Sequence, residues 1–260
     1  MAGEFDTPVW RGERKEKEKQ ILNKSGISGK IRHISIGRKS RRKENGRMRL
    51  RNIPRAEAVV AASPFVIQKP HELRGAWKQR FGNEHPIHME VGMGKGRFLR
   101  EMAARHPDFN YIGIERYTSV LLRAIEKIEE GQTPSNYLFL CQDAMLLPEI
   151  FAPGEIERIY LNFSDPWPKE RHAARRLTSE RFLACYEKIL KTDGIVEFKT
   201  DNKELFAFSL ESAAAAGWQI TAFTLDLHRD AMGEGNVMTE YEEKFSGRGN
   251  AICKMIIRRP

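Results

Sequence analysis

The sequence predicts a Rossmann-like α/β fold with a seven-stranded, mostly parallel sheet whose last strand is antiparallel. From residue 87 onward, short apolar-rich runs of strand length alternate with segments of helical periodicity. A glycine-rich turn follows the first of these runs. The last two strand-like runs have no strong helical pattern between them, so we expect them to pair as antiparallel neighbours, whereas the earlier strands form right-handed βαβ units.

The individual elements follow from the spacing of their apolar residues. Helical periodicity is followed by Gly194 in one segment and by Gly217 in another, and glycine is common just after a helix. We expect strands at residues 87–91, 111–114, 137–141, 156–163, 195–199, 218–227 and 251–257. We expect helices at residues 98–103, 120–128, 182–190 and 205–216.

The positive charge of the chain is concentrated in its first 47 residues. The 260 residues carry a formal net charge of +9, and residues 1–47 account for +8 of it. Because these residues offer little apolar surface to offset the entropy of ordering, we expect a basic, disordered extension over 1–47 and one domain over 48–260. The extension either contacts RNA or is dispensable. A nucleic-acid partner of the domain must therefore be argued from local basic clusters.

The cysteine and apolar patterns exclude several classes of protein. The three cysteines, Cys141, Cys185 and Cys253, are scattered and have no histidine at zinc-site spacing, so we expect neither a disulfide framework nor a metal site. No apolar run reaches the roughly 18 residues of a membrane span, and no secretory signal stands at the N-terminus. The sequence predicts a cytoplasmic protein without a membrane partner, either a monomer or a homodimer.

A glycine-rich turn joins the first predicted strand to the first predicted helix, in the order Glu90-Val-Gly92-Met-Gly94-Lys-Gly96. Glycine lets a backbone turn tightly and approach a ligand closely. The dinucleotide fingerprint requires a further glycine at the position of Arg97, so a hydride-transferring dehydrogenase is disfavoured. By itself the turn is also compatible with a loop that binds no nucleotide.

Acidic residues stand at the ends of the first three predicted strands. Glu115 can accept hydrogen bonds from both hydroxyls of a ribose, and Asp143 can accept one from an adenine amino group. Together with Glu90, they would line one crevice at the carboxyl ends of the strands. S-adenosylmethionine suits such a crevice, because it has no pyrophosphate and its sulfonium and amino groups are cationic.

The segment after the fourth predicted strand reads Leu161-Asn-Phe-Ser-Asp165-Pro-Trp167-Pro-Lys169. Its two prolines restrict the backbone around Asp165 and Trp167. Asp165 is either a reactive carboxylate or a turn residue, and Trp167 either packs or stacks on a base. A basic cluster follows, and the i, i+4, i+5 spacing of its arginines places them on one side of a helix, as phosphate contacts or as a solvated face. The cluster comprises Arg171, His172, Arg175 and Arg176.

Five blocks of the sequence together resemble the bacterial tRNA (guanine-N7-)-methyltransferase family. The resemblance covers about residues 48–260, and the blocks occur in the family's order. It implies a class I methyltransferase fold and an enzyme that uses S-adenosylmethionine to methylate N7 of a guanine in the variable loop of tRNA. The blocks are EVGMGKGRF from residue 90, NYIGIE from residue 110, LNFSDPWPK from residue 161 with RHAARRLT from residue 171, FKTDN from residue 198 and TEYEEKF from residue 239.

Taken with the glycine-rich turn, the resemblance implies a role for each matching residue. Asp165 would be the catalytic residue. The cofactor would be contacted by Glu90, Gly92, Gly94, Glu115, Asp143 and Asp165. The substrate guanosine would be held by Lys169, Asp201, Thr239, Glu240, Tyr241 and Glu242. The tRNA would be contacted by Arg171, His172, Arg175 and Arg176.

The chemistry of N7 methylation is compatible with these roles. Guanine N7 has an unprotonated lone pair in the ring plane, so its attack on a methyl group needs no general base. Asp165 can accept hydrogen bonds from guanine N1–H and N2–H and stabilise the positive charge that develops. Two alternatives stay open. One is a methyltransferase for another base or an exocyclic amine, where the acid or amide is followed by Pro-Pro-aromatic, and the other is a non-catalytic RNA-binding protein with this fold.

Overall fold

The computed structural model describes residues 53–128 and 136–260. The predicted basic extension over residues 1–47 and the predicted start of the domain at Met48 lie outside these residues. Within the described ranges, no helix combines the length and the apolar character that crossing a membrane requires.

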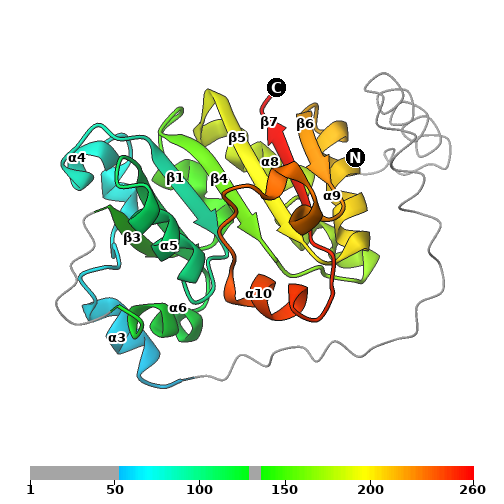
Figure 1. Cartoon of the computed structure of the whole chain (residues 1–260). Coiled ribbons are helices and arrows are strands. Elements are labelled where there is room, and N and C mark those ends of the chain that lie inside the picture. The colour runs from blue at the N-terminus through cyan, green and yellow to red at the C-terminus, as the bar shows by residue number, and fades with distance from the viewer. Residues whose placement is uncertain (1–52, 129–135) are drawn as a thin grey trace, which may run out of the picture.

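A single mixed sheet forms the centre of the described fold (Figure 1). Its strands are β1 (Ile87–Val91), β2 (Asn110–Glu115), β3 (Tyr137–Cys141), β4 (Ile156–Asn162), β5 (Leu190–Thr200), β6 (Gln219–Thr224) and β7 (Cys253–Arg258). They lie in the order β3-β2-β1-β4-β5-β7-β6. The strands β1 to β5 pair in parallel, and β7 runs antiparallel to both of its neighbours. This confirms the predicted sheet and its antiparallel last strand.

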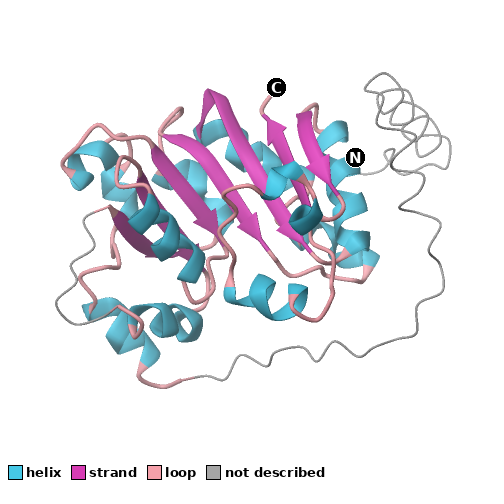
Figure 2. Ribbon diagram, in the orientation of Figure 1, coloured by secondary structure: helices cyan, strands magenta, loops and turns pink. Residues whose placement is uncertain are grey.

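Helices cover both faces of the sheet (Figure 2). The α-helices are α3 (Ala56–Ala62), α4 (Trp77–Phe81), α5 (Arg97–Arg105), α6 (Thr118–Ile125), α7 (Leu147–Ile150), α8 (Glu180–Ile189), α9 (Lys203–Ala215) and α10 (Glu240–Ser246). Short 3₁₀ helices span Pro70–Leu73, Ala144–Leu146, Glu170–Arg175, Leu227–Arg229 and Ala231–Gly233. One core contains side chains of α3, α5 and α6, and the other contains those of α7, α8 and α9.

The alternation of side chains along β1 brings an acid into the interior. Successive side chains of a strand point to opposite faces of the sheet. Ile87, Met89 and Val91 belong to the core that α7, α8 and α9 share, so His88 and Glu90 face the side of α5. All five side chains are buried. Glu90 therefore lies beneath the glycine-rich turn, at the carboxyl end of the strand.

The predicted role of Gly194 as the residue that closes a helix is wrong. The helix α8 ends at Ile189, and β5 begins at Leu190 without an intervening loop. Gly194 lies in the irregular stretch of β5 before Ile195, where a Cβ would stand 2.9 Å from the carbonyl oxygen of Lys191 and 3.1 Å from that of Glu157 in β4. The absence of a side chain at this glycine therefore allows the irregular stretch of β5 to bend back on Lys191 and to pack on β4.

The helix α10 was not expected before the last strand. It has seven residues, and its first turn contains Glu240, Glu242 and Glu243. Its two aromatic residues, Tyr241 and Phe245, are too few to establish a helical period in so short and acidic a segment. In Figure 1 it lies beyond the arrowheads of β1, β4 and β5, at the carboxyl ends of these strands.

Gly113 in β2 faces the glycine-rich turn without room for a side chain. A Cβ there would lie 2.1 Å from Met93 Sδ and 3.0 Å from Leu99 Cδ2. The missing side chain lets Met93 pack directly on β2, which sets the distance between the turn and the sheet.

We expect Gly113→Ala to lower the free energy of unfolding by about 1–3 kcal/mol, the typical cost of overpacking a core. Replacing Met93 by alanine removes the crowded sulfur. Gly113→Ala should therefore cost much less in a Met93→Ala background than in the wild type. Chemical denaturation of the four proteins measures both costs, and equal costs would show that Met93 is not the obstacle.

Candidate active site

The glycine-rich turn after β1 adopts a backbone conformation that favours glycine. Gly92, Gly94 and Gly96 have φ angles of 76°, 58° and 72°, in the left-handed region. The carboxylate of Glu115 holds this turn, because it accepts hydrogen bonds from the backbone N–H groups of Gly94 (3.2 Å) and Tyr117 (3.1 Å). Burial raises the pKa of Glu115 above its ordinary value. The turn and the predicted ribose acceptor thus form one unit.

Glu90 is a buried carboxyl group with one free oxygen. Asn162 of β4 donates a hydrogen bond to its Oε1 (2.9 Å), whereas Oε2 has no hydrogen-bond partner among the described residues. Glu90 is 1% exposed, and burial raises its pKa to about 8. An unpaired buried oxygen costs free energy, so this one is suited to a donor or cation of a bound molecule.

Asp143, which follows β3, has partners within the protein. Its Oδ1 accepts a hydrogen bond from the Met145 N–H (2.9 Å), and its Oδ2 lies 3.5 Å from Arg116 Nη1. Asp143 therefore caps a short 3₁₀ helix, and its contact with an adenine stays a prediction. The structure does place Glu90, Glu115 and Asp143 at the ends of three adjacent strands.

The loop of residues 163–167, which we call the strained loop, contains Asp165. Phe163 and Trp167 have positive φ angles (52° and 41°), which are uncommon outside glycine and cost of order 1–3 kcal/mol each. Arg176 holds this backbone, since its Nε donates to the Pro166 carbonyl (3.0 Å) and its Nη2 to the Trp167 carbonyl (3.1 Å). Asp165 is exposed between the two strained residues.

The basic cluster does not form the α-helical face that its spacing predicted. Glu170–Arg175 is a 3₁₀ helix with three residues per turn, and Arg176 follows it in an extended conformation. The guanidinium of Arg176 is partly buried, 4.2 Å from the ring centroid of Phe208, and burial lowers its pKa. Its donors serve the strained loop, so it does not face outward with Arg171 and Arg175, which are exposed.

Trp167 packs against members of the basic cluster. The Arg175 guanidinium lies 5.0 Å from its ring centroid, and the His172 ring meets it edge-on at 5.7 Å between centroids. These contacts show a packing role, and stacking on a base stays a prediction. Lys169, between Trp167 and the 3₁₀ helix, is exposed.

The helix α10 brings other predicted substrate residues to the strained loop. The Thr239 hydroxyl caps the helix by accepting a hydrogen bond from the Glu242 N–H (3.0 Å). The Tyr241 ring packs on Phe163 with centroids 5.0 Å apart, and its hydroxyl donates to Asp201 at 3.4 Å. Burial and the negative charge of Asp201 raise the pKa of Tyr241 to about 12. Tyr241 and Asp201 therefore meet beside the strained loop.

Glu242, by contrast, lies in the interior. It is fully buried, and its carboxylate accepts hydrogen bonds from Lys199 Nζ (2.6 Å) and Asn236 Nδ2 (2.7 Å). His228 Nε2 lies 3.2 Å away. Burial lowers the pKa of Lys199, and Glu242 opposes that shift. The structure does not bring the Glu242 carboxylate to the groups near the strained loop, and sequence reasoning missed Lys199 although it stands in the block FKTDN.

Glu240 faces the glycine-rich turn. Its carboxylate pairs with Lys95 of the turn, at 3.4 Å, and with Lys127. Neither lysine was among the residues predicted to form the site. The available signal was the position of Lys95 between two glycines of the turn.

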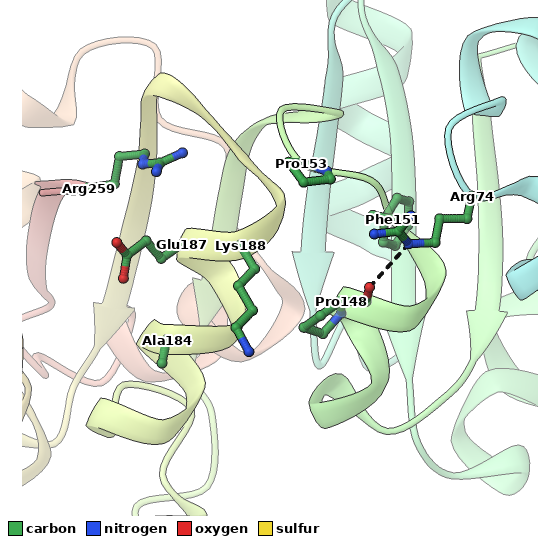
Figure 3. A pocket seen from close by; sticks show the side chains of 8 residues that line it. All are labelled: Arg74, Pro148, Phe151, Pro153, Ala184, Glu187, Lys188 and Arg259. Carbon is green, nitrogen blue, oxygen red and sulfur yellow. Dashed lines mark hydrogen bonds between the residues drawn. The ribbon is translucent and has the colours of Figure 1, made fainter.

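Two of the cavities formed by the described residues show how space is distributed around this sheet. The larger, about 530 Å³, opens between α7 and α8, where β4 and β5 begin, and so lies at the opposite end of these strands from the strained loop (Figure 3). The smaller, about 160 Å³, is lined in part by Asn162 and Lys199. It therefore adjoins the buried partners of Glu90 and Glu242.

Comparisons with known proteins agree with this geometry. A family profile described as "Putative methyltransferase" matches residues 84–255. A tRNA (guanine-N(7)-)-methyltransferase of Lachnoclostridium phytofermentans is 54% identical over 212 residues, which are 82% of this chain and 99% of the relative. One from Geobacillus sp. (strain WCH70) is 53% identical over 214 residues, 82% of this chain and 96% of the relative. The chain belongs to the tRNA (guanine-N7-)-methyltransferase family.

Solved structures of other methyltransferases share the fold of this family member. The 16S rRNA methyltransferase KamB aligns with a TM-score of 0.54 at 13% identity, over 72% of this chain and 94% of that chain. An antibiotic-related methyltransferase aligns with a TM-score of 0.52 at 18% identity, over 71% and 92%. At these identities the likeness concerns the fold alone, and it confirms the predicted class I methyltransferase fold.

Metal-type clusters are absent from the part of this methyltransferase that the structure describes. No group of three or more His, Cys, Asp or Glu side chains there is arranged to hold an ion. That the enzyme uses no metal stays a prediction.

The raised pKa of Glu90 predicts that this methyltransferase loses stability as pH rises. Glu90 keeps its proton up to about pH 8 in the folded protein, but a glutamate of the unfolded chain loses it near pH 4.5. The folded state binds more protons in that window, so its stability should fall across it. Glu90→Gln cannot ionise and should show a flatter profile. Thermal unfolding without cofactor, from about pH 5 to 8.5, measures the difference, and parallel profiles would contradict a protonated Glu90.

Proposed function

We propose that the chain transfers the methyl group of S-adenosylmethionine to N7 of a guanine in the variable loop of tRNA. One observation carries the proposal: buried Glu90 and Glu115, the strained loop with Asp165, and α10 with Tyr241 gather at the carboxyl ends of the parallel strands. Ligands of open α/β sheets bind in the crevice at this edge. The activity named for the two bacterial relatives supports the choice of tRNA and of N7.

The residues at this edge fit S-adenosylmethionine. The unpaired Oε2 of Glu90 suits a cationic group, and a cation there would favour the ionised carboxylate. Each oxygen of Glu115 accepts one backbone hydrogen bond and keeps a further lone pair for a ribose hydroxyl. The bare backbone of Gly92–Gly96 permits close approach. We propose Asp143 as the adenine acceptor and Asp165 as a further cofactor contact.

Asp165 would orient and stabilise the guanine. When bound, the cofactor supplies an electrophilic methyl group. Asp165 accepts hydrogen bonds from guanine N1–H and N2–H, which directs N7 toward the methyl group, and its charge stabilises the positive charge that develops on the ring. No side chain has to remove a proton. Because Phe163 and Trp167 fix the backbone on either side, the carboxylate is held before the substrate arrives.

The remaining predicted substrate residues divide by their surroundings. Glu240 and Glu242 are engaged in ion pairs, so we propose that they act indirectly by fixing α10. The residues proposed to hold the guanosine are Lys169, Asp201, Thr239 and Tyr241. The residues proposed to contact tRNA are Arg171, His172 and Arg175.

We also propose that residues 1–47 are an extension outside a catalytic domain at 48–260. The match to the Lachnoclostridium relative supports this division, because it spans 82% of this chain but 99% of the relative. A cytoplasmic location is compatible with a tRNA substrate. Gel filtration would distinguish a monomer from a homodimer.

Asp165→Asn should lower kcat by about 10²–10³-fold, the usual effect of losing a preorganised electrostatic group, while S-adenosylmethionine binding stays measurable by calorimetry. Asp193→Asn changes an exposed acid at the beginning of β5 and should keep full activity. Mass spectrometry of nucleosides from unmodified tRNA should detect N7-methylguanosine with the wild type. Methyl label at an exocyclic amine would contradict the proposed function, and a wild-type kcat for Asp165→Asn would remove Asp165 from the chemistry.

Arg176→Ala and Arg171→Ala should affect different kinetic constants. Arg176→Ala releases the strained loop, so we expect a lower kcat and a loss of about 1–3 kcal/mol of stability. Arg171→Ala should raise the KM for tRNA and leave kcat unchanged. It should also make the plot of log K against log salt concentration less steep by about 1, as for the loss of one phosphate contact. Steady-state kinetics at several salt concentrations separate the two. A change confined to KM in Arg176→Ala would contradict its role in the loop.

A further inference from the structure

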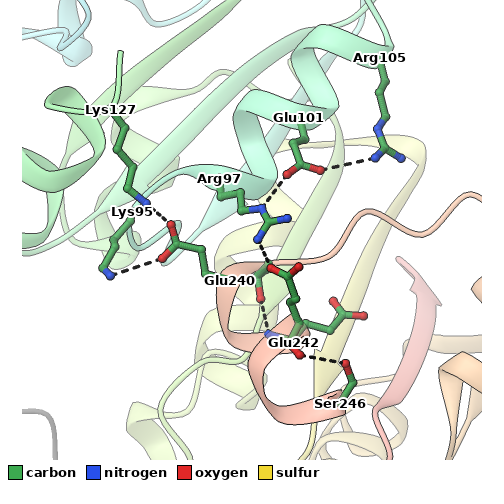
Figure 4. Close-up of polar contacts among 10 residues, drawn as sticks. Lys95, Arg97, Glu101, Arg105, Lys127, Glu240, Glu242 and Ser246 are labelled. Atoms are coloured by element: carbon green, nitrogen blue, oxygen red, sulfur yellow. Dashed lines mark hydrogen bonds and ion pairs between the residues drawn. The ribbon is translucent and has the colours of Figure 1, made fainter. Parts of the chain in front are cut away.

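Ion pairs attach α10 to the glycine-rich turn and its surroundings (Figure 4). Lys95 Nζ lies 3.4 Å from Glu240 Oε2, and Lys127 pairs with Oε1 of the same carboxylate. Arg97 pairs with Glu243 through its Nη1. Lys95 and Glu240 are 145 positions apart in the sequence. The proposed cofactor turn and the proposed guanosine helix are therefore joined directly by side chains.

Arg97 is placed to transmit a movement of the turn. It is the first residue of α5 and directly follows Gly96. Its Nε donates to Glu101 Oε1 (2.7 Å), one helical turn further along α5, while its Nη1 donates to Glu243 of α10. The planar guanidinium is thus fixed by its own helix on one side. A shift at Gly96 must change the contact with Glu243.

The exposure of this pair limits its contribution to stability. The side chains of Arg97 and Glu243 are 30% and 57% exposed, and water screens ion pairs in such positions. The anchoring of α10 comes instead from the buried pair of Lys199 and Glu242 and from the packing of Tyr241. The pair of Arg97 and Glu243 can therefore direct α10 without deciding whether it forms.

We propose that Arg97 and Glu243 are positioning residues that couple cofactor binding to tRNA binding. This inference rests on the proposed function. Filling the glycine-rich turn restricts its backbone, and Arg97 passes that restriction to α10. The guanosine site is then already partly ordered when tRNA arrives, so tRNA binding loses less conformational entropy. A bound cofactor therefore tightens tRNA binding, and bound tRNA tightens cofactor binding by the same factor.

The test measures the dissociation constant of unmodified tRNA with and without saturating S-adenosylhomocysteine. For the wild type we expect tRNA to bind about 5- to 10-fold more tightly with this ligand, within the usual range of coupling between sites. We call the dissociation constant without the ligand, divided by that with the ligand, the coupling ratio. Arg97→Gln and Glu243→Gln should each bring this ratio close to one, and the double variant should add no further loss. Arg97→Lys keeps the charge and should retain part of the ratio. Glu149→Gln, an exposed acid on α7, is the control and should keep the wild-type ratio.

Two further readouts separate coupling from damage to the fold. Affinity for S-adenosylhomocysteine without tRNA, and the melting temperature, should stay close to wild type in Arg97→Gln and Glu243→Gln. The inference is overturned by a wild-type ratio of one, by unchanged ratios in both variants, or by an equal loss of cofactor affinity without tRNA. Nucleoside analysis of the same wild-type preparation tests the proposed function separately, because N7 methylation with a ratio of one would refute the coupling alone.

Discussion

The ion pair between Lys199 of β5 and Glu242 of α10 is the contact on which the C-terminal part of the site depends. Both side chains are almost wholly withdrawn from water, and removing one partner of such a pair costs about 3–5 kcal/mol. Asn236 Oδ1 and the Val237 carbonyl accept the other hydrogen bonds of Lys199. Lys199 can make this ion pair and these hydrogen bonds only when the segment of residues 227–242 returns across the end of β5. The position of α10 is set by that return.

Because Glu242 faces inward, the rotation of α10 about its axis is fixed, and with it the side to which each other residue of the helix points. Tyr241 lies on the strained loop, while Glu240 and Glu243 lie on the side of the glycine-rich turn. A helix of seven residues has little stability of its own, so these tertiary contacts decide its orientation. One short segment thereby touches the elements proposed to bind the cofactor and those proposed to bind the guanosine.

The sequence predicted correctly those parts of the site whose positions follow from the apolar runs of neighbouring residues along the chain. The carboxyl ends of β1, β2 and β4 follow from apolar runs, so Glu90, Glu115 and Asp165 lie where they were expected. The directions of Arg176 and Glu242 could not be predicted in this way. Arg176 turns inward because the carbonyls of a strained backbone need its donors, and Glu242 turns inward because a lysine 43 positions away is buried beneath it. Both outcomes depend on tertiary partners that no spacing rule records.

The place of β7 in the sheet determines the order in which the sheet can be completed. It follows the other described strands in the sequence, yet it lies between β5 and β6, with Cys253 opposite Thr200. Among the strands that the structure describes, β6 pairs with β7 alone. While the chain is being synthesised, the edge of β5 stays open and β6 has no strand to join. The sheet can therefore be completed only after residues 253–258 have left the ribosome, because β5 and β6 both pair with this segment.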